Sequence, residues 1–187
     1  NTLTLQANNK ITIVSLTDGV LDLTGISTTI TFSTGDGGTG FTMSAGHKIL
    51  FDATDFIIDA VTGSIFIGAL FGDSDVDLIA NQITIDAAST FKSIIVQSAG
   101  GGIIINDNIT TTGVRGLTLD GDTVIGGPSG GVTFAGGVML ASASGITLRA
   151  DNLGAGDLVT LGALTLISTD EVDDEVSWTV KIDDTLH

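Results

Sequence analysis

The chain has 187 residues, of which 42% are hydrophobic, a share that excludes an intrinsically disordered protein. Its 22 acidic and 6 basic residues give a net charge of −16, which argues against binding to nucleic acid or to an anionic membrane surface. The absence of cysteine excludes a disulfide scaffold and any thiolate metal site.

Short alternating triplets of residues run along most of the chain. Nine of them carry threonine at the centre: Leu3-Thr4-Leu5, Ile11-Thr12-Ile13, Ile30-Thr31-Phe32, Phe41-Thr42-Met43, Ile83-Thr84-Ile85, Leu117-Thr118-Leu119, Val132-Thr133-Phe134, Ile146-Thr147-Leu148 and Leu164-Thr165-Leu166. Alternation with period two is typical of β-strands with one buried face, which threonine, isoleucine and valine suit. Turns rich in glycine and aspartate follow many triplets. We therefore predict about twenty short strands and little or no helix.

Strands of this length are too short for a β-sandwich, whose strands usually have about five or six residues. They suit a solenoid, in which each strand stacks on its equivalent in the next coil. With two or three strands per coil, residues 1–169 would form roughly seven to ten coils and a rod roughly 35–50 Å long. The predicted fold is therefore an all-β, right-handed parallel β-helix. Inward isoleucine, leucine and valine side chains would form stacked aliphatic ladders.

Two triplets in the middle of the chain are apolar at every position. In Ile94-Ile95-Val96 and Ile103-Ile104-Ile105 the central side chain should point outward, where a loop or a neighbouring chain would cover it. The stretch from Thr123 to Leu148 carries no charge, but its many glycines and Pro128 exclude a membrane helix. We expect no membrane insertion.

The C-terminal segment, residues 170–187, differs in character from the rest of the chain. An acidic run is followed by Val176–Ile182, the longest clean alternation in the sequence, which holds the only tryptophan. We predict that this segment caps the solenoid or joins it to another subunit by strand addition. The residues expected to mediate self-association lie at the two ends of the rod: Trp178, Val180 and Ile182 at one end, and Leu3, Leu5, Ile11 and Ile13 at the other.

The repeats resemble a known family of bacterial surface proteins. The segments LTLQANNKITI, ITIDAAST, GLTLDGDTVIGG and GITLRADNLGAGDLVTLGALTLIS are similar to the right-handed β-helix repeats of filamentous-haemagglutinin-like exoproteins, which include two-partner-secretion substrates and autotransporter passengers. The resemblance covers roughly residues 2–168. It implies an extended, secreted rod outside the cell or at its surface, used for adhesion or for building a matrix or surface layer.

Acidic residues supply the candidate metal ligands. Two sets of aspartates stand out: Asp73, Asp75 and Asp77 in one turn, and Asp170, Asp173 and Asp174 in the acidic run. Carboxylate oxygens are the ligands that Ca²⁺ prefers, so both sets are candidate calcium sites. The alternative is that they are solvated acids that keep the rod soluble. No other cofactor is expected.

The sequence offers no recognisable catalytic apparatus, and we predict that the protein is not an enzyme. Serine hydrolysis needs a base beside the nucleophile, and cleavage of acidic polysaccharides needs clustered basic residues. The two histidines and the six scattered bases form neither pattern. A polysaccharide-cleaving β-helix enzyme therefore stands as the weakest of the functional alternatives.

The leading expectation is a structural building block of a filament, surface layer or adhesin stalk that self-associates end to end. The alternative is a module that binds ice or a glycan of a host or another cell surface. A flat threonine array needs the same register in successive coils. The central threonines follow one another at irregular intervals, from Thr4 and Thr12 to Thr147 and Thr165, which predicts poor stacking on any one face.

Overall fold

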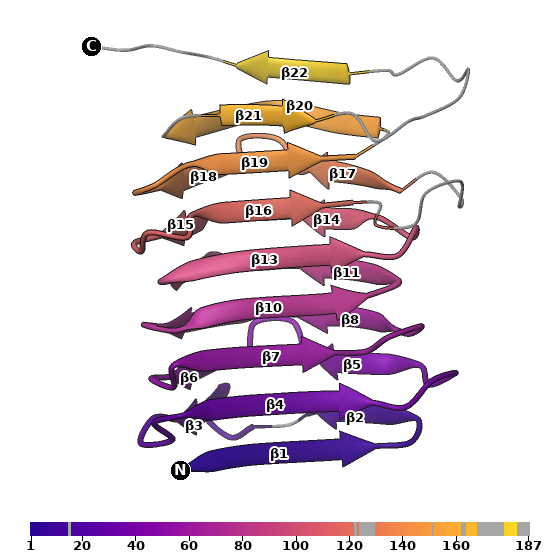
Figure 1. The fold of residues 1–187 in the computed structure, drawn as a ribbon, viewed down its shortest axis with the longest axis vertical. Helices are drawn as coiled ribbons and strands as arrows, with labels where there is room; N and C mark the ends of the chain where they lie inside the picture. Colours follow the sequence, from indigo (N-terminus) through magenta and orange to yellow (C-terminus); the bar gives the residue numbers. More distant parts are fainter. Residues whose placement is uncertain are drawn as a thin grey trace.

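A computed structural model gives the protein as a stack of parallel coils (Figure 1). The structure describes residues 1–14, 16–121, 123 and 130–150, together with the backbone of the strands Asn152–Leu161, Leu164–Ile167 and Trp178–Ile182. All regular elements in this described part are β-strands. Correspondingly, it contains no helix long and apolar enough to cross a membrane.

The strands form three parallel sheets, which we name A, B and C. Sheet A contains β1 (Thr2–Ala7), β4 (Thr29–Thr34), β7 (Asp55–Asp59), β10 (Asp75–Ala80), β13 (Ser93–Ser98), β16 (Leu117–Asp120), β19 (Ile146–Arg149) and β21 (Leu164–Ile167). Sheet B contains β2 (Lys10–Ile13), β5 (Gly40–Met43), β8 (Ser64–Ile67), β11 (Gln82–Ile85), β14 (Ile103–Ile105), β17 (Gly131–Phe134), the first part of β20 (Asn152–Leu161) and β22 (Trp178–Ile182). Sheet C contains β3 (Val20–Leu23), β6 (Lys48–Phe51), β9 (Ala69–Gly72), β12 (Ser89–Phe91), β15 (Ile109–Thr111), β18 (Met139–Ser142) and the second part of β20.

Each coil contributes one strand to each sheet, and the chain winds upward as a right-handed helix (Figure 1). Sheet A is 8-stranded, so the number of coils falls within the predicted range. The fold-class prediction of a right-handed parallel β-helix is therefore confirmed. The coils differ in length: one turn runs from Thr2 to Thr29, whereas a later turn runs only from Asp75 to Ser93.

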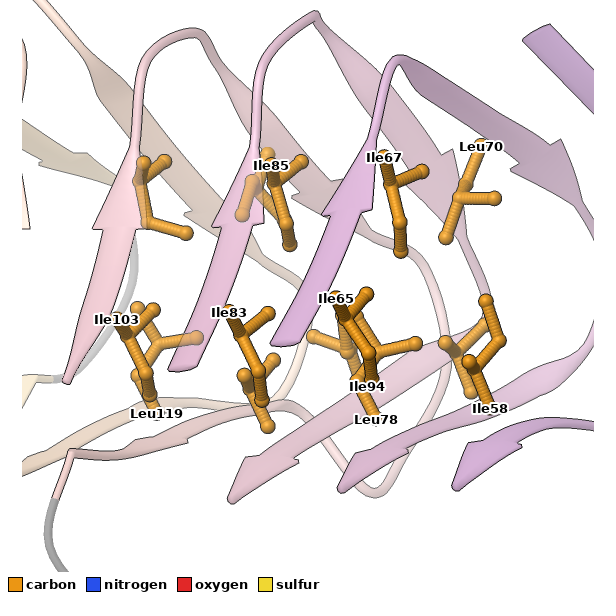
Figure 2. Packing of buried hydrophobic residues seen from close by; sticks show 14 of the residues in the cluster. Ile58, Ile65, Ile67, Leu70, Leu78, Ile83, Ile85, Ile94, Ile103 and Leu119 are labelled. Atoms are coloured by element: carbon orange, nitrogen blue, oxygen red, sulfur yellow. The ribbon is translucent and has the colours of Figure 1, made fainter. Parts of the chain in front are cut away.

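Inward side chains form the predicted aliphatic ladders. Ile65, Ile83 and Ile103 occupy one register position on successive strands of sheet B, and Ile67 and Ile85 occupy the next (Figure 2). All five are 0–1% exposed. Each rung therefore buries its apolar surface against the rungs above and below it, which stabilises the stack through neighbour contacts along the axis.

Phenylalanine side chains cluster in the core of the early coils. Phe32 lies against Phe41 and Phe56, with ring centroids 5.4 and 5.9 Å apart, and Phe51 stacks on Phe56 at 4.4 Å. Only two of the eight phenylalanines, Phe66 and Phe71, are not buried. Aromatic rings thus add to the aliphatic core expected from the sequence: four of them cluster in the early coils, and Phe91 and Phe134 are buried in later coils.

Glycine sets the corners at which the chain passes from one sheet to the next. Gly40 begins β5 with a φ of 107°, in the left-handed region that favours glycine. A Cβ at this position would collide with the backbone oxygen of Ser64 in the next coil. The close approach of successive coils at this corner therefore requires glycine. The glycine-rich segment that precedes β5 forms a turn between sheets A and B.

Candidate functional site

The N-terminal coil leaves the end of the hydrophobic core partly open. Strands β1, β2 and β3 are the outermost strands of their sheets. The inward residues Leu3, Ile11 and Leu21 are only partly buried, although their partners in the next coil, Ile30, Phe41 and Ile49, are all 0% exposed. The first coil therefore presents both apolar side chains and an unpaired strand edge within the described structure.

The structure brings together the residues that we predicted to self-associate at this end. Leu3, Ile11 and Ile13 pack against the core from one side, and Leu5 is 45% exposed even though its partner Phe32 is buried. At the opposite end, β22 pairs in parallel with β20 and extends sheet B. The side chains of Trp178, Val180 and Ile182 lie outside the described residues, so their role stays a prediction.

A charged cluster lies on the outer face of sheet A. Arg115, in the turn before β16, reaches back across a coil to Asp75 at 3.2 Å and to Asp77 at 4.0 Å. Ser93 donates a hydrogen bond of 2.6 Å to the other oxygen of Asp75. Asp55 stands in register with Asp75 on the neighbouring strand. The Arg115 guanidinium and the Ser93 hydroxyl thus link strands of sheet A through Asp75 and Asp77, while Asp55 adds a third carboxylate nearby.

The two carboxylates that contact Arg115 titrate in opposite directions. Burial raises the pKa of Asp75, but hydrogen bonds from Ser93 and Arg115 and the charges of Arg115 and Lys92 outweigh it, so the pKa is lowered overall. For Asp77, burial raises the pKa, the charge of Arg115 lowers it, and the charges of Asp55 and Asp75 raise it further. The pKa of Asp77 is therefore raised overall. The two pKa values shift in opposite directions because only Asp75 accepts a hydrogen bond from the Ser93 hydroxyl, and because Asp77 lies farther than Asp75 from Arg115.

The geometry around these aspartates gives no support to a calcium site. Asp75 and Asp77 point outward together, as expected from their alternation, but Asp73 lies exposed in the bend before β10. Across the described ranges, no three acidic or histidine residues are grouped so that they could hold a metal ion. The Arg115 guanidinium faces Asp75 and Asp77 and partly compensates their charge. Asp170, Asp173 and Asp174 lie outside the described residues, and calcium there stays a prediction.

The sequence pattern does not identify the basic partners in these contacts. Arg115 and Arg149 are scattered along the chain, yet Arg115 contacts two aspartates and Arg149 one, all from earlier coils. Arg149 on β19 lies 3.4 Å from Asp120, which is its register partner on the preceding strand of sheet A, β16. Since the turns differ in length, no fixed spacing along the chain identifies these pairs.

The central threonines share a register despite their irregular spacing along the chain, but they form no continuous row on any one face. All nine occupy one register position in sheet A or the equivalent position in sheet B, and none lies in sheet C. In sheet A the row holds Thr4 and Thr31 at one end and Thr118, Thr147 and Thr165 at the other, separated by Ile57, Asp77 and Ile95. In sheet B the row runs Thr12, Thr42, Phe66, Thr84, Ile104 and Thr133. The turns absorb the irregular spacing, so the strands keep their register.

Comparison with protein-family models, with curated proteins and with solved structures gives no match to this chain. The fold and the surfaces described above therefore carry the functional argument.

Proposed function

We propose that the protein is an extracellular structural component, a building block of a filament, surface layer or adhesin stalk, whose rods join end to end by strand addition. One observation carries the proposal: the core of the first coil is partly open, while the equivalent positions in the second coil are fully buried. The resemblance of the repeats to filamentous-haemagglutinin-like exoproteins supports the same role and a location outside the cell or at its surface.

The two ends of the rod are suited to join head to tail. In the described structure β1, β2 and β3 are the outermost strands at one end, and β21, β22 and the second part of β20 are outermost at the other. Because all strands run parallel, the last coil of one chain can continue each sheet into the first coil of the next. Such a contact is heterologous and non-closing, which generates a filament.

Charge favours this arrangement over contact between two C-terminal ends. Residues 168–187 contain seven acids and a single base, whereas residues 1–28 contain only two acids, Asp18 and Asp22. Two C-terminal segments would repel each other, while an N-terminal coil carries little net charge. Charge thus disfavours contact between two C-terminal ends, and the parallel strand direction favours the last coil of another chain as the partner of the first coil.

A matched pair of variants tests the proposal. Leu5→Lys places a charge on the open end of the core, at a position already 45% exposed, whereas Thr4→Lys places the same charge on the outer face of the same strand. Negative-stain microscopy and light scattering should show filaments for the Thr4→Lys variant and a strong loss for Leu5→Lys, with circular dichroism confirming that both fold. Equal polymer formation by the two variants would contradict end-to-end joining through this coil.

A second candidate function, binding of ice or of a glycan to a flat outer face, is favoured by the shared register of the threonines. Thr2, Thr4, Thr29 and Thr31 form a two-by-two array on β1 and β4. A thermal-hysteresis assay and a glycan array test this candidate, and Thr31→Lys should abolish any such binding. No activity in either assay would remove it.

A further inference from the structure

The two ends of the rod carry the same triplet pattern at the same register positions of sheet A. β1 contains Leu3-Thr4-Leu5, and β21, the last strand of the sheet, contains Leu164-Thr165-Leu166. The register pairs that run from strand to strand place the two triplets in the same three rows. In the middle of the rod the central row holds Ile57, Asp77 and Ile95, so the match belongs to the ends and is not a property of every coil.

Sheet B repeats this match between its two ends. β2 contains Ile11-Thr12-Ile13, and on β22 Trp178 and Thr179 occupy the rows of Ile11 and Thr12. Val180 follows Thr179 in the sequence as Ile13 follows Thr12. Among the described strands sheet C ends one coil earlier, at the second part of β20, so sheets A and B are the two that can be compared.

We infer that β21 of one chain pairs in parallel with β1 of the next in unshifted register, triplet opposite triplet, and that β22 pairs with β2 in the same way. The inference rests on the proposed function and names the strands and the register through which two rods join. Each joint continues the inward ladders from chain to chain. It also brings together five threonines on consecutive strands of sheet A, a type of pair that stabilises neighbouring strands: Thr118, Thr147 and Thr165 of one chain, and Thr4 and Thr31 of the next.

The inward leucines of the first coil select the unshifted register. Leu5 is 45% exposed, whereas Phe32, the next residue in its row, is 1% exposed. A shift of one residue would place the inward leucines of β1 opposite the threonine of the partner strand, because the faces of a strand alternate. A shift of two residues would place either Gly162 opposite Leu3 or Ser168 opposite Leu5. Only the unshifted register therefore puts a leucine opposite both Leu3 and Leu5.

Pairs of cysteines can report the register, because the natural sequence has no cysteine. The double variant Thr4→Cys/Thr165→Cys places two Cα atoms about 4.8 Å apart across the joint, within reach of a disulfide. The matched control Thr2→Cys/Thr165→Cys uses an equally exposed position two residues along β1, where the Cα atoms would be about 8 Å apart and out of reach. β1 and β21 lie at opposite ends of sheet A, so each disulfide must join two chains. After mild oxidation we expect a ladder of linked chains on a non-reducing gel, with at least roughly tenfold more linkage than in the control.

Negative-stain microscopy of the natural chain and of both reduced variants separates this inference from the proposed function. Filaments with equal linkage in the two variants, or with more linkage in the control, would overturn the register and leave end-to-end joining standing. Linkage in the single variant Thr4→Cys would show two first coils in contact, which overturns the head-to-tail direction as well. Absence of filaments in the natural chain would overturn the proposed function and this inference together. The pair Thr12→Cys/Thr179→Cys gives a second readout on sheet B, with Lys10→Cys/Thr179→Cys as its control.

Discussion

The substitution Ile83→Ala removes a rung from the centre of the core. Ile83 is 0% exposed and lies between Ile65 and Ile103 on the inner row of sheet B (Figure 2). Ile11 occupies the same row at the end of the stack, where it is only partly buried beside Phe41. Ile83→Ala and Ile11→Ala therefore remove the same side-chain atoms, the first from a fully buried position and the second from a partly exposed one.

The expected magnitudes follow from the number of neighbouring rungs. Truncation of a fully buried isoleucine to alanine costs about 2–5 kcal/mol, from lost transfer free energy and the cavity that remains. Ile83 loses packing against a rung on each side. Ile11 has a rung on one side only, so we expect its truncation to cost about half as much, roughly 1–2.5 kcal/mol.

Denaturant unfolding, followed by far-ultraviolet circular dichroism, measures the loss in free energy of unfolding for each variant. The protein concentration is kept low enough that the chains do not associate. Amide hydrogen exchange in β2, measured in dilute and in polymeric protein, should show that the first coil becomes protected when chains join. Equal costs for the two variants in single chains would refute the reasoning, because the first coil would then be as well covered as the centre.

Three further predictions concern the charged cluster, a coil corner and the C-terminal segment. Because the fold raises the pKa of Asp77, its ionised form opposes folding. Asp77→Asn should therefore raise the free energy of unfolding at pH 7, by on the order of 0.5 kcal/mol for a partly solvated group, and should give no gain at pH 3. Asp75 has a lowered pKa, so its ionised form stabilises the fold at pH values above the usual carboxyl range. Asp75→Asn should lower the free energy of unfolding at pH 7, and this difference should disappear as the pH falls through the lowered pKa. Urea titrations at a series of pH values measure both effects, and the same sign for both variants would contradict this assignment. Gly46→Ala should lower the free energy of unfolding by about 1–2 kcal/mol, because the backbone at this position is left-handed. Gly40→Ala should lower it by about 1–3 kcal/mol more, because the added Cβ also collides with Ser64. Similar thermal midpoints for the two variants would argue against the close approach of the coils at Gly40. Deletion of residues 170–187, which include β22, should abolish filaments seen by negative stain, and normal assembly of the shortened chain would count against a joining role for this segment.

The alternation of residues was sufficient to predict the strands and the fold class. Triplets such as Ile83-Thr84-Ile85 have one inward and one outward face whatever lies around them, because successive side chains on a strand point to opposite sides. Frequent glycines and the brevity of the strands then favoured a solenoid over a sandwich. The inward ladders and the outward threonines are local properties, and the structure confirms them.

Only the tertiary structure decided which strands share a sheet and which side chains meet across coils. The turns vary in length, so Thr4 and Thr31 align in sheet A, and Thr12 and Thr42 in sheet B, although their spacing along the chain suggested no common register. Arg115 contacts Asp75 for the same reason. Hydrogen bonds between coils set the register, and the turns take up the surplus residues. A spacing read along one chain therefore cannot show which positions face each other.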